Sequence, residues 1–259
     1  MTTAANALVG RGILITRSEE DCAEWALVIE RRGARPVLLP CIHCESIDTP
    51  QLRAELGAAL ALADWLVLTS RRGVEACVRL RARRDAAASR AAAAAPVALP
   101  ARTRVAVVGE ATAAAARAAF GRVDLVGGGT AAALGTALAA DTRLARGAHV
   151  ALALAENSGD ALERALAAAG AHCTRFDVYR TVPAPPAASK RALSSLGAER
   201  VVLASPSAAS GFVHQVDVDV PVAIYTIGPS TTAAARALGL DVTAEAREPS
   251  LEGILEAMQ

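Results

Sequence analysis

Short apolar runs alternate along the chain with longer stretches that carry one apolar face. Residues 12–39 show the pattern first and read as strand, helix and strand. Ser18 can cap the helix, with Asp21 three residues later, and Gly33 stands where a glycine ends a helix. Alternating strands and helices of this length predict parallel sheets with helices on both faces, the doubly wound α/β class.

The same plan returns in residues 149–182, where the interval from Val150 to Gly170 equals the interval from Ile13 to Gly33. Three further pairs of segments follow in the same order: "DWLVLTSRRGVEACV" and "RVVLASPSAASGFV", "VVGEATAAAARAAFG" and "TIGPSTTAAARALG", and "VDLVGGGTAAALGTAL" and "LDVTAEAREPSLEGILEAM", with Thr130 and Ser250 as matching N-caps. Four consecutive matches exceed what an alanine-rich composition explains. The chain is therefore predicted to contain two similar α/β domains that arose by internal duplication.

Polar residues gather where the predicted strands end. In parallel sheets these carboxyl ends meet at one edge, which is where ligands bind. The residues there are hydroxyls, an amide and a cation: Arg17, Thr69, Ser70, Thr112, Asn157, Ser205, Ser207 and Thr231. Backbone N–H groups at the following helix starts attract anions, so we expect a ligand with acidic groups.

Composition and charge exclude several classes of partner. The 259 residues include 27 basic and 26 acidic ones, a net charge of +1, which provides no general field for nucleic acid or an anionic membrane. No apolar run reaches the roughly 18 residues that span a bilayer, and the start of the chain lacks the pattern of a signal peptide. We expect a soluble, cytoplasmic protein.

The five cysteines form an odd, scattered set, which favours reduced thiols over disulfides. Cys41 and Cys44 make a CxxC pair, but they lie in an extended stretch that points them to opposite faces. A zinc site would also need a second ligand pair, and the histidines show no ligand spacing. We therefore predict neither a metal site nor a redox motif.

Between the two copies, residues 79–104 are rich in alanine and arginine and include Pro96 and Pro100. The second copy has no such segment. We expect a surface excursion that is helical at first and flexible later, and a solvated loop rather than an arm that binds polyanions.

The order and spacing of seven short motifs resemble the uroporphyrinogen-III synthase family. The motifs, none of them specific alone, are "LITR", "LTSRRGVEA", "VVGEATA", "VYRTV", "LASPSAASGF", "IGPSTTAAA" and "PSLEGILEAM". The resemblance covers nearly the whole chain. It implies an enzyme of heme and other tetrapyrrole synthesis that works without a cofactor. Such an enzyme cyclises hydroxymethylbilane to uroporphyrinogen III, with inversion of ring D and loss of water.

The resemblance also implies an architecture. Two α/β domains are joined by a two-stranded ladder, here residues 38–45 and 173–181, and the substrate lies in the cleft between the domains. One domain would be discontinuous, from 1–39 plus 181–259, and the other would be 40–180. The only partner implied is the small-molecule substrate, and we expect a monomer.

Site residues follow from the same motifs. Tyr179 matches the linker tyrosine of the family and is the candidate proton donor or water-orienting group; the alternative is a tyrosine that packs with its hydroxyl in water. The positions that match substrate-binding hydroxyls and cations are Arg17, Thr69, Ser70, Arg72, Thr112, Ser205, Ser207 and Thr231. The alternatives are N-capping for the hydroxyls and solvated charges for the arginines.

Two features leave other functions open. The second copy has "AENSGD", with Glu156, where the family often has an arginine-glycine pair, which allows a relative that binds a tetrapyrrole without turnover. Gly127, Gly129 and Ala132 fit the G-x-G-x-x-A spacing of a nucleotide-binding loop. The matching segment of the other copy has no glycine cluster, which argues against that second reading.

Overall fold

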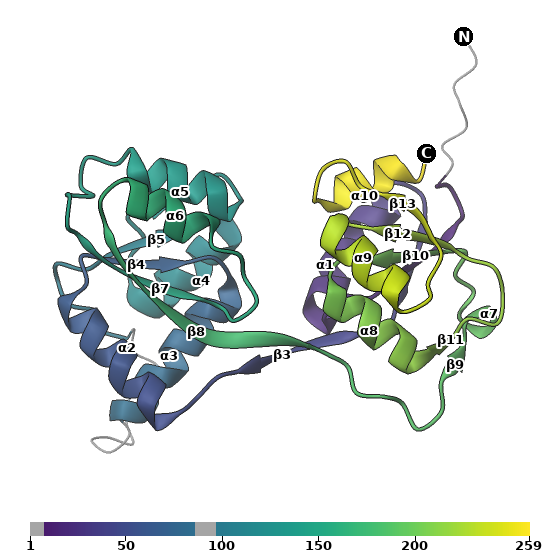
Figure 1. The fold of residues 1–259 in the computed structure, drawn as a ribbon, viewed down its shortest axis with the longest axis horizontal. Helices are drawn as coiled ribbons and strands as arrows, with labels where there is room; N and C mark the ends of the chain where they lie inside the picture. The colour runs from purple at the N-terminus through teal and green to yellow at the C-terminus, as the bar shows by residue number, and fades with distance from the viewer. Residues whose placement is uncertain (1–7, 86–96) are drawn as a thin grey trace, which may run out of the picture. The chain divides into compact units, whose positions relative to one another are not determined.

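The computed structural model describes residues 8–85 and 97–259, which divide into two compact units (Figure 1). The first unit comprises Met1–Cys44 and Thr181–Gln259, and the second comprises Glu45–Arg180. The chain thus passes from the first unit to the second after Cys44, whereas the motifs placed this boundary after residue 39. It returns to the first unit at Thr181, the residue at which the motifs placed the second boundary. Each unit has its own sheet and its own core.

The first unit is built on a sheet of five strands in the order β13-β12-β10-β1-β2. All of its neighbouring strands run parallel. The strands are β1 (Gly12–Ile15), β2 (Arg35–Leu38), β10 (Arg200–Leu203), β12 (Ala223–Thr226) and β13 (Val242–Glu245), and two short strands outside this sheet, β9 (Arg191–Ala192) and β11 (Val216–Asp217), pair with each other.

Helices cover both faces of this sheet, because successive residues of its buried strands point to opposite sides. Ile13 and Ile15 pack in one cluster with α1 (Glu19–Arg31) and α10 (Leu251–Ala257). Leu14, between them in β1, packs in a second cluster with α7 (Leu193–Leu196), α8 (Pro206–Gln215) and α9 (Pro229–Ala237). The first unit therefore has three layers.

The second unit has a sheet in the order β3-β8-β7-β4-β5-β6, parallel from β8 to β6. Its strands are β4 (Trp65–Leu68), β5 (Arg104–Val107), β6 (Leu125–Val126), β7 (His149–Ala155), β8 (His172–Pro183) and β3 (Ile42–Ser46). Its helices are α2 (Pro50–Leu62), α3 (Arg71–Asp85), α4 (Glu110–Phe120), α5 (Ala131–Ala139) and α6 (Ala161–Ala168). Figure 1 shows α5 and α6 on one face of this sheet and α2 and α3 on the other.

The two sheets confirm the predicted duplication and show how it is distributed. Strands β2-β1-β10-β12-β13 of the first unit correspond in order to β8-β7-β4-β5-β6 of the second. The sequence repeats, however, do not coincide with the units. Strands β1 and β2 come from the first repeat and lie beside β10, β12 and β13 of the second repeat, and the second unit is composed in the converse way.

Strands β3 and β8 carry the chain between the units, and they are neighbours in the sheet order. The Ala184 N–H donates to the Cys41 carbonyl at 2.7 Å, and the Ile47 N–H donates to the Val178 carbonyl at 3.0 Å. Residue numbers rise along one strand as they fall along the other, so the pair is antiparallel. This is the two-stranded ladder that the resemblance implied, with β3 starting four residues later than residue 38.

The local start and stop signals lie where the sequence placed them. Ser18 caps α1 and accepts a hydrogen bond from the Asp21 N–H, and Thr130 and Ser250 cap α5 and α10 in the same way. Gly33 and Gly170 follow the ends of α1 and α6 with φ of +81° and +85°. These left-handed conformations favour glycine, because a Cβ atom would be strained there.

The predicted excursion over residues 79–104 is helical at first, as expected, and is too long only at its C-terminal end. Helix α3 continues to Asp85, and β5 begins at Arg104. Residues 97–101 are also attached to the unit: the Val97 N–H donates to the Ala119 carbonyl, and Arg122 donates to the Pro100 carbonyl. The alanine-rich centre, residues 86–96, lies outside the described residues.

Candidate active site

The predicted site residues occupy the carboxyl edges of the two sheets. In the second unit Thr69, Ser70 and Arg72 follow β4, Thr112 follows β5, and Tyr179 lies on β8. In the first unit Arg17 follows β1, Ser205 and Ser207 follow β10, and Thr231 follows β12. Each unit thus presents its own set of strand-end groups, as parallel sheets require.

Tyr179 and Ser70 contact each other directly. The Tyr179 hydroxyl and the Ser70 Oγ are 2.9 Å apart, although the residues are separated by 109 positions in sequence. Tyr179 is only 9% exposed, and Ser70 is half-buried. The Tyr179 hydroxyl thus contacts a second predicted site residue, and two residues that the sequence singled out separately form one group.

An irregularity in β8 brings Tyr179 to this position. Leu154 of β7 pairs with Asp177, but Ala155 pairs with Tyr179, so Val178 is an additional residue in the ladder. The extra residue turns Tyr179 toward the face that Phe176 occupies, where strict alternation would place it on the face of Asp177. The bulge thus re-aims the tyrosine toward the start of α3.

Ser70 also organises the start of α3. Its Oγ accepts a hydrogen bond of 3.0 Å from the Gly73 N–H. A Cβ atom on Gly73 would lie 3.1 Å from the Ala153 carbonyl oxygen and 3.4 Å from the Ser70 Oγ. Glycine therefore lets the first turn of α3 approach the end of β7, with the Ser70 hydroxyl at its start.

Ser205 is the equivalent serine of the first unit. It caps α8 and accepts a hydrogen bond of 3.0 Å from the Ala208 N–H. Thr69 and Ser207, which lie close to these serines in sequence, are half-buried and make no side-chain hydrogen bond with another described residue. Capping accounts for Ser70 and Ser205 in part, and it does not account for Thr69 and Ser207.

The helix starts that carry Thr112 and Thr231 have glycine N-caps. Gly109 begins α4 and Gly228 begins α9, and neither helix has a side-chain cap. Thr112 and Thr231, three residues later in each case, are 5% and 1% exposed. Their burial argues against direct substrate contact by these side chains. The groups that such helix starts offer to an anion are backbone N–H groups.

Arg17 is held within the first unit. It donates to Asp21 at 2.9 Å, and its guanidinium lies 4.6 Å from the centre of the Trp25 ring. Its Nε is buried and has no hydrogen-bond partner among the described residues. The alternative of a freely solvated charge does not hold for Arg17. Arg72, on the first turn of α3, is half-buried.

Arg175 was not among the site residues predicted from the sequence. From β8 it donates to Glu163 and Asp177 and to the carbonyls of Ala155, Glu156 and Ser158. Burial alone would lower the pKa of Arg175, but its hydrogen bonds to Asp177 and Glu163 outweigh that effect and raise it. An arginine two residues before an aspartate in a strand with a half-buried face was the available signal.

This arginine fixes the loop that departs from the family motif. The loop after β7 contains Glu156, whose N–H donates to the Tyr179 carbonyl at 2.8 Å. Arg175 of β8, the strand next to β7, places a positive charge against the carbonyls of this loop. Its hydrogen bonds bind the loop to β8 directly next to the bulge that orients Tyr179.

The family model "Uroporphyrinogen-III synthase HemD" matches residues 23–256, nearly the whole chain. The chain belongs to the uroporphyrinogen-III synthase family. No curated protein sequence matches it significantly.

Two solved structures share the fold of this family member. A mutant uroporphyrinogen III synthase from the extremely thermophilic bacterium Thermus thermophilus is 19% identical, with a TM-score of 0.54, and the match covers 95% of this chain and 96% of that chain. Uroporphyrinogen-III synthetase from Helicobacter pylori is 15% identical, also with a TM-score of 0.54, over 95% of this chain and 97% of that chain. At this identity the likeness establishes the two-domain architecture.

The nucleotide-binding alternative finds no support in this synthase fold. The loop with Gly127 and Gly129 follows β6, a two-residue strand at the edge of the sheet. Dinucleotide fingerprints follow a central strand, where the order of strands reverses. A Cβ on Gly127 would lie 2.9 Å from Leu134, so this glycine serves close packing of α5.

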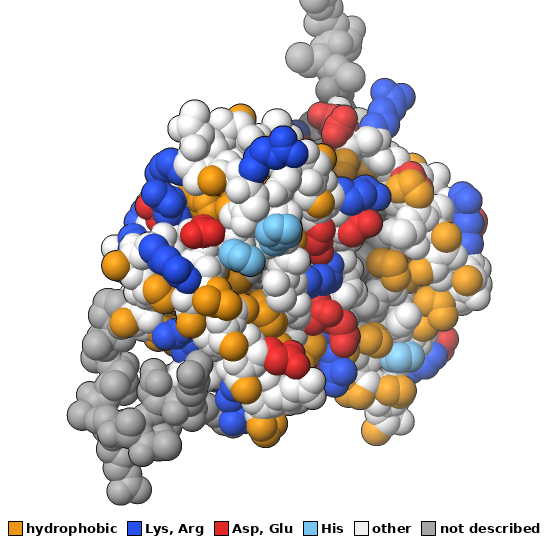
Figure 2. Space-filling view, turned by 60° about the vertical axis from the view of Figure 1, so that its left-hand side comes forward, with side chains coloured by type: hydrophobic (Ala, Val, Ile, Leu, Met, Phe, Trp, Pro, Cys, Tyr) orange, Lys and Arg blue, Asp and Glu red, His pale blue; other side chains and the backbone are white. Residues whose placement is uncertain are grey.

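All five cysteines are free, and burial raises the pKa of Cys41 and Cys77 to about 12. Residues 8–85 and 97–259 contain no group of three or more side chains that could hold a metal ion. No described helix has the length and apolar character needed to cross a membrane. Acidic and basic side chains are interspersed on the face shown in Figure 2.

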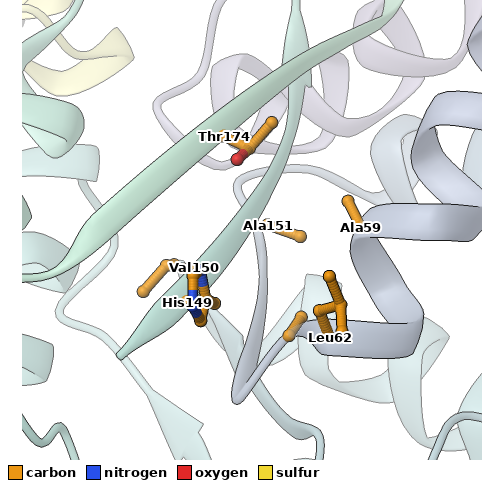
Figure 3. A pocket seen from close by; sticks show the side chains of 7 residues that line it. Ala59, Leu62, His149, Val150, Ala151 and Thr174 are labelled. Atoms are coloured by element: carbon orange, nitrogen blue, oxygen red, sulfur yellow. The ribbon is translucent and has the colours of Figure 1, made fainter. Parts of the chain in front are cut away.

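A small cavity of about 90 Å³ lies at the opposite edge of the second unit's sheet (Figure 3). Ala59 and Leu62 of α2 border it, with His149 and Val150 at the start of β7 and Thr174 on β8. Because strands start there, the cavity is remote from the strand ends that carry Ser70 and Thr112. Its size and position separate it from the candidate active site.

Proposed function

We propose that this chain catalyses the synthase reaction of its family: it closes hydroxymethylbilane to uroporphyrinogen III, inverts ring D and releases water. Family membership over residues 23–256 carries this proposal. The contact between Tyr179 and Ser70 supports it, because it places an acidic hydroxyl at the strand ends where ligands of this fold class bind. The reaction belongs to heme and other tetrapyrrole synthesis.

The chemistry makes two demands on the protein. The hydroxymethyl oxygen must receive a proton as it leaves, and the resulting cation must be held so that the correct carbon of ring D attacks it. Positioning supplies most of the effect, because unguided closure would join the ends without inversion. The Tyr179 hydroxyl is the proposed source of the proton.

The substrate bears many carboxylates, which suit dispersed hydrogen-bond donors. We propose that the strand-end groups of both units bind them: Arg17, Thr69, Ser70, Arg72, Ser205 and Ser207 through side chains, and the glycine-capped starts of α4 and α9 through backbone N–H groups that Thr112 and Thr231 help to hold. N–H groups at helix starts favour negative charge without basic residues. This agrees with a net charge of only +1.

The family works on a small molecule, and nothing in the proposed mechanism requires a second chain. We propose that the protein acts as a monomer in the cytoplasm and without a cofactor. Sedimentation at enzyme concentrations used for assay tests the first point.

A product analysis tests the proposed function. Purified protein is supplied with hydroxymethylbilane, the product is oxidised, and the type I and type III porphyrin isomers are separated. We expect the type III isomer to dominate, in excess over the enzyme. A product that consists of type I alone, at the rate of a reaction without protein, would show that the chain lacks synthase activity.

A further inference from the structure

The Ser70 hydroxyl occupies a junction in the second unit. Its Oγ lies 2.9 Å from the Tyr179 hydroxyl oxygen and accepts the Gly73 N–H at 3.0 Å. No other hydrogen bond of the Ser70 side chain is present among the described residues. A hydroxyl oxygen can accept two hydrogen bonds and donate one. One of the two hydroxyls must donate to the other, so the second hydroxyl's own O–H is directed elsewhere.

Burial indicates which hydroxyl faces outward. Tyr179 is 9% exposed, whereas Ser70 is half-buried at the edge of the sheet. If Tyr179 donates to Ser70, the two acceptor positions of Ser70 are filled by Tyr179 and Gly73. The O–H of Ser70 then points away from both partners. The more exposed of the two residues thus carries the hydroxyl that can reach a ligand.

We propose that Ser70 conducts the proton of Tyr179 to the leaving hydroxyl of the substrate. The proposal rests on the proposed function and refines it: the phenol is the acid, because it is more acidic than an aliphatic hydroxyl, and the serine is the group that touches the reacting oxygen. The Gly73 N–H, in the first turn of α3, stabilises the serine oxygen while the proton passes.

The step conserves atoms and charge. The bond between the hydroxymethyl carbon and its oxygen breaks, and the oxygen leaves with the electron pair and takes the Ser70 proton to form water. Ser70 takes the proton of Tyr179. The substituted carbon of ring D, which carries no proton, then bonds to the hydroxymethyl carbon, and its bond to the bridge carbon of the preceding ring breaks. That bridge carbon bonds to the unsubstituted end carbon of ring D, which loses its proton, and the proton returns through Ser70 to the phenolate. The net reaction releases one water and consumes no proton.

A double-mutant cycle tests the relay. Tyr179→Phe should slow single-turnover formation of the type III isomer about 10- to 100-fold, at or below the low end of general acid catalysis. Ser70→Gly should slow it to a similar degree, since glycine is tolerated at an N-cap and removes only the hydroxyl. Because both groups serve one proton path, the double variant should be no slower than the slower single variant.

Ser250→Ala is the matched control for loss of a cap. Ser250 accepts the Gly253 N–H at 3.0 Å, the same geometry as at Ser70, but it begins α10 and is not a site residue. Its activity should stay within about twofold of wild type. Ser70→Thr, which keeps a hydroxyl, should recover most of the activity that Ser70→Gly loses.

A proton inventory provides a readout that a structural role would not move. In mixtures of H2O and D2O, the plot of wild-type rate against deuterium fraction should be curved, because two protons move together. The same plot for Tyr179→Phe should be linear. The ¹³Cζ resonance of Tyr179, one of only two tyrosines, should also shift in Ser70→Gly and not in Ser250→Ala.

The outcomes separate the relay from the function on which it rests. Wild-type protein that forms no type III isomer would overturn both. An active wild type whose double variant shows multiplied losses would overturn the relay alone, because the two hydroxyls would then act independently. An unshifted Tyr179 resonance in Ser70→Gly would also overturn it.

Discussion

Helices α3 and α8 begin with the same serine cap, but only the cap of α3 also contacts a tyrosine hydroxyl. Each follows a central strand, and each has a serine, Ser70 or Ser205, whose Oγ accepts a backbone N–H three residues later at 3.0 Å. In the second unit the serine also contacts Tyr179, and two arginines follow it in sequence. In the first unit Pro206 follows, and no described aromatic hydroxyl contacts the serine.

The difference indicates that the two duplicated units have different functions. A capped helix start can bind anionic groups in either unit, because both offer backbone N–H groups and the positive end of a helix dipole. Proton transfer needs an acid as well, and only the second unit places one there among the residues that the structure describes. We therefore interpret the first unit as a site of carboxylate binding and the second as the site of both binding and proton transfer.

The length of one strand produces this difference. Strand β2 of the first unit has four residues, whereas its counterpart β8 has twelve and contains the bulge before Tyr179. The extra length carries β8 to the end of β7, where Tyr179 contacts Ser70 in the loop after β4. The duplication supplied two equivalent turns, and the longer strand added a functional group to one of them.

The largest expected effect concerns Arg175, whose counterpart by register in the first unit's β2 is the uncharged Leu38. Arg175→Gln should lower the free energy of unfolding of the second unit by about 2 kcal/mol, because charged hydrogen bonds are lost and Glu163 remains. The two tryptophans separate the units, since Trp25 lies on α1 and Trp65 on β4. Denaturation is followed in variants that keep one tryptophan each.

Arg164→Gln is the control for this experiment. Arg164 is also in the second unit, but its side chain is 73% exposed and it pairs with Asp160, four residues earlier in the chain. Its loss should change the free energy of unfolding by less than about 0.5 kcal/mol. If the Trp25 signal reports the same destabilisation by Arg175→Gln as the Trp65 signal, Arg175 does not act within the second unit alone.

A smaller effect sharpens the comparison at the glycine-capped helices. Thr112→Val and Thr231→Val keep the shape of a buried residue and remove its hydroxyl. Each should lower kcat/KM about fivefold, the equivalent of about 1 kcal/mol, and the two effects should agree, because both threonines lie three residues after a glycine N-cap. A loss confined to one variant would show that the two helix starts are not equivalent in binding.

The smallest effect is a difference in alkaline stability. Burial raises the pKa of Cys22 to about 11 and of Cys41 to about 12 in the first unit, and that of Cys77 to about 12 in the second. Their contribution to stability is complete below the ordinary thiol pKa of about 8.5 and is lost as the pH rises toward 11 or 12. Burial also raises the pKa of Cys173 in the second unit, but that thiol is only half-buried. With two fully buried thiols against one, the first unit should lose stability more steeply above about pH 9. Equal slopes for Trp25 and Trp65 would contradict this.

Much of the fold was predictable because its signals are local. Ser18, Gly33 and Gly170 mark helix ends through the backbone conformations that they favour, and the repeated order of segments predicted two similar sheets. The exchange of strands between the units is not visible in the repeats themselves, because a repeat records similarity and not contact. It was available only through the family resemblance.

The contacts of the site were less predictable for the same reason. The motifs identified Tyr179 and Ser70 separately, but their contact depends on a bulge at Val178. No residue type in this stretch predicts the bulge. Arg175 was missed because half of its hydrogen bonds go to backbone carbonyls, which every sequence contains. The burial of Thr112 and Thr231 depends on packing around the helix starts, which the pattern of residues does not specify.

The most direct test of the division of work compares Ser70→Gly with Ser205→Gly. Both remove an N-cap hydroxyl of the same geometry, so their costs in helix stability should match. Steady-state and single-turnover rates of type III formation are measured for both. We predict that Ser70→Gly lowers kcat about tenfold or more, whereas Ser205→Gly mainly raises KM by a few fold. Equal losses of kcat in the two variants would contradict the assignment of proton transfer to the second unit.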